Sequence, residues 1–105
     1  MWFRQTYSPI RIFAIPNGGK RGKAEAARLK AEGVSAGVPD LYIPEWKLWI
    51  EMKRQEDGVL STDQAKWRDY LLGIGDDWIL AKGKEEAIRQ VEQFRRTVKE
   101  NKPND

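Results

Sequence analysis

The sequence predicts a single domain of the α/β or α+β class, with its elements in the order β-α-β-β-α-β-α. Short apolar runs bounded by turn residues alternate with stretches rich in Ala, Leu, Lys and Glu, which favour helix. Over residues 84–100, apolar side chains recur at helical spacing. The chain has 105 residues and contains no internal repeat or linker. We therefore expect one domain over residues 1–105.

The first half of the chain predicts three strands and one helix. Residues 10–15 are bulky and apolar and end at a dense turn signal, so they predict a strand. Residues 23–32 predict a helix, and Gly33 follows where a left-handed cap would lie. Residues 40–43 and 48–53 predict two strands joined as a hairpin.

The second half predicts helix, strand and helix. Residues 61–64, Ser-Thr-Asp-Gln, match the capping box that opens a helix, and this helix should run to about Leu72 before Gly73 and Gly75. Residues 78–81 predict a strand. A helix follows with its apolar stripe, and residues 101–105 form a polar tail.

The composition excludes several classes of chemistry. The chain contains no Cys and no His, so disulfides, thiolate nucleophiles, imidazole bases and zinc sites built from these residues are absent. Any catalysis must use carboxylates, amines and hydroxyls. No apolar run is long enough for a membrane span, and the N-terminus lacks the pattern of a signal peptide. We expect an intracellular, cytoplasmic protein with no membrane partner.

Positive charge is concentrated near the N-terminus. Residues 1–33 hold seven basic residues and two acids, whereas the whole chain has a net charge of +3. A basic surface attracts polyanions such as nucleic acids, although a solvated surface is the simpler interpretation.

Three charged residues fall on strands that otherwise look buried. A hairpin loop centred on Glu45 and Trp46 brings Asp40 directly opposite Glu51, about 5 Å apart between β-carbons. Lys53 is two residues beyond Glu51, so its side chain should lie on the same face. Opposed carboxylates repel unless a cation lies between them. The alternative is that all three are ordinary residues at strand ends.

Two carboxylates without His or Cys favour a hard cation such as Mg²⁺ or Mn²⁺, and such a site suits phosphate chemistry. Lys53 could orient water or neutralise charge in the transition state. Gln64 could close the capping box on Ser61 or lie beside the site. The segment from Asn17 to Arg21 is either a phosphate cradle or only a flexible basic turn, because it lacks the Walker spacing.

We assign no function to the five tryptophans. Trp49 and Trp78 lie in apolar strands and are expected in the core, whereas Trp2, Trp46 and Trp67 are undecided.

Several short motifs together resemble the VRR-NUC domain, which belongs to the PD-(D/E)xK nuclease superfamily. The resemblance runs from about Ile12 to Leu80. It is carried by Ile15-Pro16-Asn17-Gly18-Gly19-Lys20-Arg21, Glu32-Gly33, Gly37-Val38-Pro39-Asp40-Leu41, Ile50-Glu51-Met52-Lys53-Arg54 and Leu60-Ser61-Thr62-Asp63-Gln64.

This resemblance implies a restriction-endonuclease-like α/β core, a mixed central sheet flanked by helices, with a shortened N-terminal helix over residues 1–7. It implies that Asp40 and Glu51 hold Mg²⁺ or Mn²⁺, with the Met52 carbonyl as a further ligand. Lys53 and Gln64 complete the implied catalytic set. The DNA contacts it implies are Asn17, Lys20, Arg21, Lys23, Arg54 and Ser61.

Small stand-alone members of the family, of bacterial or phage origin, resemble Holliday junction resolvases. The resemblance therefore implies a homodimeric, metal-dependent endonuclease that cuts branched DNA. Cutting two strands symmetrically requires two active sites, and each subunit would supply one.

One departure from the family pattern leaves alternatives open. The family has a further acid on its N-terminal helix, but the first acid of this chain is Glu25. Three explanations stay open: sequence upstream of Met1 supplies the acid, the protein works with one metal ligand fewer, or Glu25 takes the place of the missing acid. A second hypothesis is therefore a weak or inactive nucleic-acid-binding module. A third is a small domain whose charged strand ends bind protein.

Overall fold

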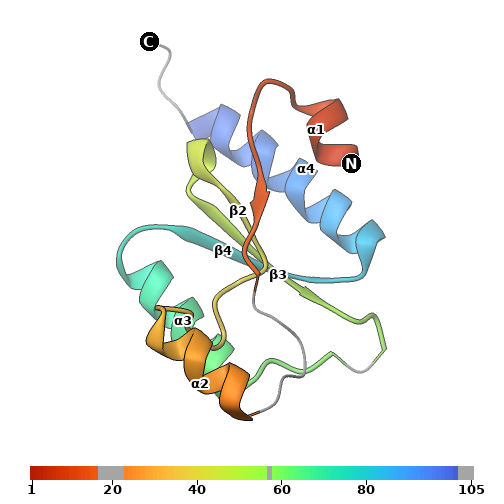
Figure 1. The fold of residues 1–105 in the computed structure, drawn as a ribbon. Coiled ribbons are helices and arrows are strands. Elements are labelled where there is room, and N and C mark those ends of the chain that lie inside the picture. Colours follow the sequence, from red (N-terminus) through yellow and green to blue (C-terminus); the bar gives the residue numbers. More distant parts are fainter. Residues whose placement is uncertain (17–22, 57, 102–105) are drawn as a thin grey trace.

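The helices and strands follow the predicted order, with the short N-terminal helix added (Figure 1). The computed structural model describes residues 1–16, 23–56 and 58–101. The elements are α1 Trp2–Thr6, β1 Phe13–Ala14, α2 Lys23–Ala31, β2 Leu41–Ile43, the 3-10 helix η1 Pro44–Trp46, β3 Leu48–Lys53, α3 Thr62–Gly73, β4 Asp77–Lys82 and α4 Lys84–Asn101.

The four strands form one mixed sheet in the order β1-β2-β3-β4. β1 and β2 are antiparallel, as are β2 and β3, whereas β3 and β4 are parallel. Parallel neighbours need a crossover connection, and α3 lies within the connection between β3 and β4. In the predicted hairpin Ile43 pairs with Leu48, and η1 together with left-handed Lys47 (φ 49°) turns the chain.

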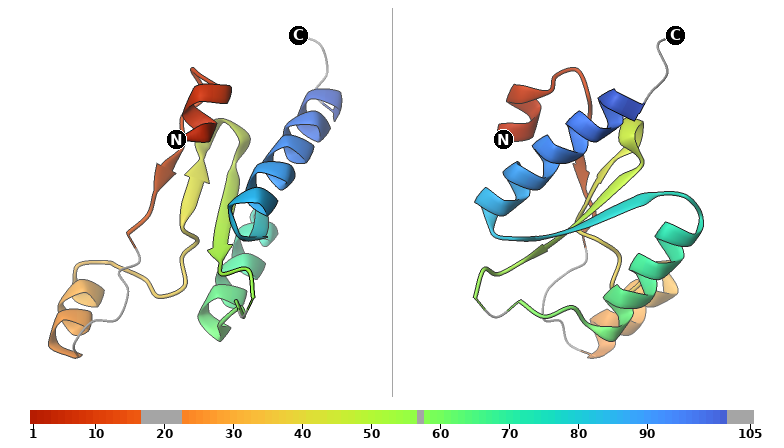
Figure 2. Two further views of the ribbon diagram at one scale, coloured as in Figure 1. Left: turned by 90° about the vertical axis from the view of Figure 1, so that its right-hand side faces the viewer. Right: turned by 180° about the vertical axis from the view of Figure 1, so that it is seen from behind.

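Helices lie on both sides of the sheet (Figures 1 and 2). α1 and α4 cover one face, and α2 and α3 lie on the other side. Core side chains from α1, the residue before β1, the sheet, η1 and α4 pack together: Phe3, Ile12, Ile43, Trp46, Leu48, Ile50, Ala81 and Val91. The strand residues of this core alternate along β2 and β3, because alternate residues of a strand point to opposite faces.

The first strand is shorter than predicted. Residues 10–15 were expected to form it, but only Phe13–Ala14 pairs, against Tyr42 and Leu41. β2 itself has three residues and offers few partners. The N–H of Ile10 donates instead to the carbonyl of Tyr7, so the start of the predicted strand belongs to the turn after α1.

The positions of the tryptophans differ from those expected. Trp46 is a core residue, 7% exposed, whereas Trp49 and Trp78 are only half-buried on the opposite face from the main core. The predicted turn at residues 17–19 and residues 102–105 of the tail lie outside the described residues. Gly33 has the left-handed conformation expected after α2 (φ 97°).

Within the described part of the chain, no helix has the length and hydropathy needed to cross a bilayer.

Candidate active site

The hairpin brings Asp40 and Glu51 together at one end of the sheet. Leu41 pairs with Ile50, so continuing the register by one residue sets Asp40 opposite Glu51. Asp40 is further fixed by two hydrogen bonds. Its Oδ2 accepts from the N–H of Met52 at 2.7 Å, and its carbonyl accepts from the N–H of Ile15 at 2.8 Å. The N–H of Met52 therefore holds the carboxylate of Asp40, and the N–H of Ile15 holds its backbone.

Glu51 is a charged residue in an interior position. It is 1% exposed, and its Oε2 has no hydrogen-bond partner within the described residues. The pKa of Glu51 is raised to about 7, mainly by burial and also by the nearby Asp40 carboxylate, whereas Lys53 lowers it. An unsatisfied buried carboxylate is costly. A group that supplies positive charge would relieve that cost.

Lys53 and Gln64 surround this pair of acids. Lys53 follows Glu51 by two residues on β3 and is half-buried, so it lies on the same face. Nε2 of Gln64 donates to Oε1 of Glu51 at 3.0 Å. Gln64 also closes the capping box, because its Oε1 accepts from the N–H of Ser61 at 2.9 Å. Both interpretations of Gln64 from the sequence therefore apply at once.

A glycine lets the start of α3 approach the site. Gly37 has φ 85°, and a Cβ there would lie 2.5 Å from the carbonyl carbon of Asp63 and 2.7 Å from the nitrogen of Gln64. Sequence reasoning assigned no role to Gly37 from geometry, although a glycine before a predicted site is a signal of close approach. The loop that leads into Asp40 thus packs directly on the first turn of α3.

The donors present fit a hard divalent cation. Asp40 and Glu51 offer carboxylate oxygens, one of them buried without a partner, and Mg²⁺ or Mn²⁺ prefers such ligands. Among the described residues, no third acid joins them to make a group of three. Glu25, whose carboxylate lies 3.7 Å from Arg28 on α2, therefore forms no such group with Asp40 and Glu51. The Met52 carbonyl stays a predicted ligand.

The predicted DNA contacts are only partly described. Asn17, Lys20 and Arg21 lie outside the described residues, and Lys23 is the first residue of α2. Arg54 is exposed directly after β3, and Ser61 is the N-cap of α3. In the sequence, Arg54 directly follows Lys53, and Ser61 lies three residues before Gln64.

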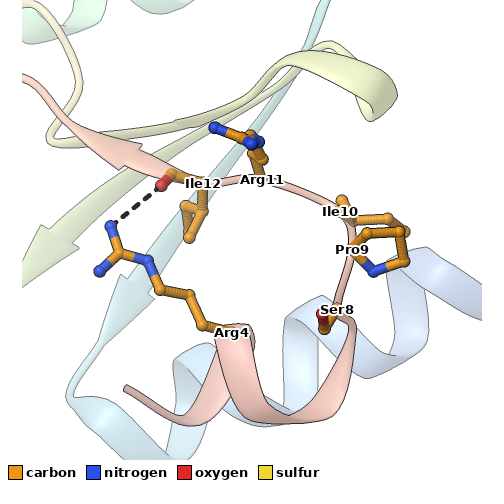
Figure 3. A pocket seen from close by; sticks show the side chains of 6 residues that line it. All are labelled: Arg4, Ser8, Pro9, Ile10, Arg11 and Ile12. Carbon is orange, nitrogen blue, oxygen red and sulfur yellow. Dashed lines mark hydrogen bonds between the residues drawn. The ribbon is translucent and has the colours of Figure 1, made fainter.

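A separate hollow of about 420 Å³ lies between α1 and β1 (Figure 3). It is lined by Arg4, Ser8, Pro9, Ile10, Arg11 and Ile12. Arg4 spans it and donates to the carbonyl of Ile12 at 3.4 Å, a long contact. None of these lining residues belongs to the group around Glu51.

Comparison with solved structures gives an informative likeness. No family model matches the chain, and no curated protein matches it. A solved structure described as a VRR_NUC domain protein superposes with a TM-score of 0.75 and 27% sequence identity, over 90% of this chain and 80% of that chain. The mixed sheet flanked by helices matches a restriction-endonuclease-like fold. The chain therefore has the VRR-NUC fold, and this likeness supports a nuclease-family domain.

Proposed function

We propose that the protein is a metal-dependent endodeoxyribonuclease that hydrolyses phosphodiesters in branched DNA, in the manner of a Holliday junction resolvase. The observation that carries the proposal is the pairing of Asp40 with a buried, incompletely satisfied Glu51, beside Lys53 and Gln64. The structural likeness to a VRR_NUC domain protein supports a nuclease with DNA as its substrate.

The two carboxylates would hold Mg²⁺ or Mn²⁺. When bound, the cation supplies positive charge for a phosphoryl oxygen and makes water a better nucleophile at neutral pH. Lys53 is placed to orient the attacking water or to neutralise charge that develops on the phosphate. Gln64 holds Oε1 of Glu51, so the carboxylate keeps one orientation.

The chain's own contacts explain how the ligands are positioned without a cation. Asp40 is held by the Met52 N–H and Glu51 by the Gln64 amide, each at normal hydrogen-bond distance. A preorganised pair of ligands loses little freedom when the cation enters, and this favours binding.

The second candidate function is a nucleic-acid-binding module that cuts weakly or not at all. The absence of a third acid from the described group around Glu51 favours it, because fewer charged ligands reduce affinity for the cation. Cleavage is the property that separates the two candidates, since both predict DNA binding.

The experiment is cleavage of a labelled four-way junction and of a matched linear duplex, each with Mg²⁺, Mn²⁺ or EDTA. We expect metal-dependent cuts at symmetric positions in the junction, which require two sites related by a two-fold axis and hence a homodimer. Metal-dependent cutting of both DNAs at equal rates would contradict the branched substrate. Binding of the junction without cutting in any metal would favour the second candidate.

A further inference from the structure

Three aromatic side chains lie across β1, β2 and β3 on the sheet face that carries Glu51. Phe13 pairs with Tyr42, and Tyr42 pairs with Trp49, so the three side chains share one face. Glu51 lies two residues beyond Trp49 on β3 and points to the same face. We call Phe13, Tyr42 and Trp49 the aromatic row.

The rings of the aromatic row support one another. The ring centroids of Tyr42 and Trp49 are 4.1 Å apart with a tilt of 32°, and those of Phe13 and Tyr42 are 5.8 Å apart at 76°. Nε1 of Trp49 donates to Oδ2 of Asp76 at 2.9 Å. The indole is therefore fixed at one end of the row, and each ring limits the motion of the next.

Phe13 is the exposed end of this row. It lies on β1, which is an edge strand, and its side chain is 48% exposed. This exposed Phe packs against the ordered ring of Tyr42, although leaving a large aromatic ring in water is unfavourable. A flat, rigid ring at this position suits a ligand that stacks.

The exposed ring lies close to the acidic pair along the sheet. Ala14 pairs with Leu41, and the next residue, Ile15, donates its N–H to the Asp40 carbonyl. Ile15 therefore lies beside Asp40, and Phe13 is two residues before Ile15 on the same face. At the usual rise of a strand, Phe13 and Ile15 are about 7 Å apart. That separation equals roughly two steps of stacked bases.

Positive charge accompanies the ring. Arg11 lies two residues before Phe13, and Figure 3 shows its side chain on the opposite side of the chain from that of Ile12. Arg11 is exposed, and the ion pairs of the described residues do not include it. Residues 1–16 contain no acid. A guanidinium beside an aromatic ring suits a nucleotide, which offers a phosphate and a base together.

We propose that Phe13 stacks on an unpaired nucleobase that lies close to the phosphate bound at Asp40 and Glu51, while Arg11 contacts a neighbouring phosphate. The nature of the ligand rests on the proposed function. Paired bases within a duplex cover each other's faces, so a protein ring stacks most readily on a base that has left the stack. The aromatic row would therefore make the site prefer DNA with unpaired bases beside the scissile phosphate.

The test is binding in EDTA, where no cleavage occurs. Fluorescence anisotropy would compare an oligothymidylate of about 12 nucleotides with an oligomer of the same length that carries abasic sites. Phe13→Leu keeps an apolar side chain but removes the stacking face, and Phe13→Trp restores such a face. Tyr70→Leu is the matched control, because Tyr70 is also exposed (58%) but lies on α3, outside the aromatic row.

We expect Phe13→Leu to weaken binding of the normal oligomer about tenfold and to leave binding of the abasic oligomer nearly unchanged. Phe13→Trp and Tyr70→Leu should bind as the wild type does. Arg11→Gln should reduce the dependence of affinity on salt, whereas Phe13→Leu should not, because only the arginine neutralises a phosphate.

Equal affinity of wild type and Phe13→Leu for the normal oligomer would overturn the proposal, as would an equal loss on both oligomers. Failure of the wild type to bind either oligomer would also overturn it and would favour a protein ligand for the aromatic row. Cleavage with Mg²⁺, measured in parallel, keeps the two proposals apart. Cleavage without Phe13-dependent binding overturns the stacking alone, and Phe13-dependent binding without cleavage overturns the nuclease alone.

Discussion

Gln64 connects a helix cap to a buried acid, since its Nε2 lies 3.0 Å from Oε1 of Glu51 while its Oε1 accepts from the N–H of Ser61. The cap decides which end of the amide faces Glu51, because only the amide oxygen can accept from the Ser61 N–H. Formation of α3 therefore delivers a correctly oriented donor to the acidic pair. The stability of the cap and the geometry of the site are linked through one side chain.

The two roles of Gln64 can be separated by substitution. Gln64→Glu keeps an acceptor for the Ser61 N–H but replaces the donor to Glu51 with a carboxylate, the third beside Asp40 and Glu51. We expect cleavage to fall about 10- to 100-fold, as is typical when a group that orients a metal ligand is lost. Ser61→Ala tests the cap alone, because it removes the hydroxyl that accepts from the Gln64 N–H, costs about 1 kcal/mol of stability and leaves the Glu51 contact in place. Because Ser61 is also an expected DNA contact, cleavage by the two variants is compared at saturating DNA. Wild-type cleavage by Gln64→Glu would refute this role.

Gly37 should be essential for the packing of α3 on the loop that precedes Asp40. Gly37→Ala adds a Cβ within 2.5 to 2.8 Å of Asp63 and Gln64 at a left-handed φ of 85°. We expect a loss of about 2 kcal/mol or more in the free energy of unfolding, measured with urea, and a loss of cleavage.

Gly33→Ala provides the matched control for backbone strain. Gly33 also has a left-handed φ, 97°, but a Cβ there meets nothing within 4 Å. We expect only about 1 kcal/mol of destabilisation and nearly normal cleavage. Equal effects of the two substitutions would show that the close approach at Gly37 is unimportant.

Stability without a metal should depend on pH through Glu51. Burial raises the pKa of Glu51 from its ordinary 4.5 to about 7, so between these values the folded state binds a proton more tightly than the unfolded state. The contribution of Glu51 to stability therefore falls as pH rises from about 4.5 to about 7 and is constant above that range. Because one pKa unit corresponds to about 1.4 kcal/mol, the decrease amounts to a few kcal/mol.

Glu51→Gln isolates this effect. Urea unfolding in EDTA across this pH range should show a smaller decrease in stability for Glu51→Gln than for the wild type. At the upper end of the range Glu51→Gln should be the more stable of the two, since its side chain carries no buried charge. Parallel pH profiles for the two proteins would contradict the assignment.

Lys53 should act on the chemical step. We expect Lys53→Ala to reduce single-turnover cleavage at saturating DNA about 100-fold or more, because a cation beside the reacting phosphate is lost. Lys82→Ala is the control, since Lys82 pairs with Lys53 in the β3–β4 register, is exposed and is not assigned to the site. Equal rates for Lys53→Ala and wild type would remove Lys53 from the mechanism.

The hairpin and the acidic pair were predictable because their determinants are local. The turn at residues 44–47 fixes the register between Ile43 and Leu48, and the register alone then sets Asp40 opposite Glu51. The capping box of α3 is likewise a short-range pattern, and the structure confirms both of its hydrogen bonds.

Contacts between elements that are distant in the sequence could not be predicted from local patterns. The contact between Gln64 and Glu51 depends on where α3 docks, and the shortness of β1 depends on how few residues β2 offers as partners. The sequence also gave no reason to place Trp46 in the core while Trp49 remains half-buried on the other face. Alternation along β3 sets Trp49 on the face opposite Leu48 and Ile50. Trp46 lies in η1 instead and is buried against aromatic rings of α1 and α4.

The most direct test of the central claim is the dependence of junction cleavage on Mg²⁺ or Mn²⁺ for wild type and Glu51→Gln. Glu45→Gln is the control, because Glu45 is an exposed acid of η1 in the hairpin turn. We predict that wild type and Glu45→Gln cut only when metal is present, and that Glu51→Gln does not cut at any metal concentration although it binds the junction. Cleavage that persists in EDTA, or wild-type cleavage by Glu51→Gln, would contradict a metal-dependent nuclease centred on Asp40 and Glu51.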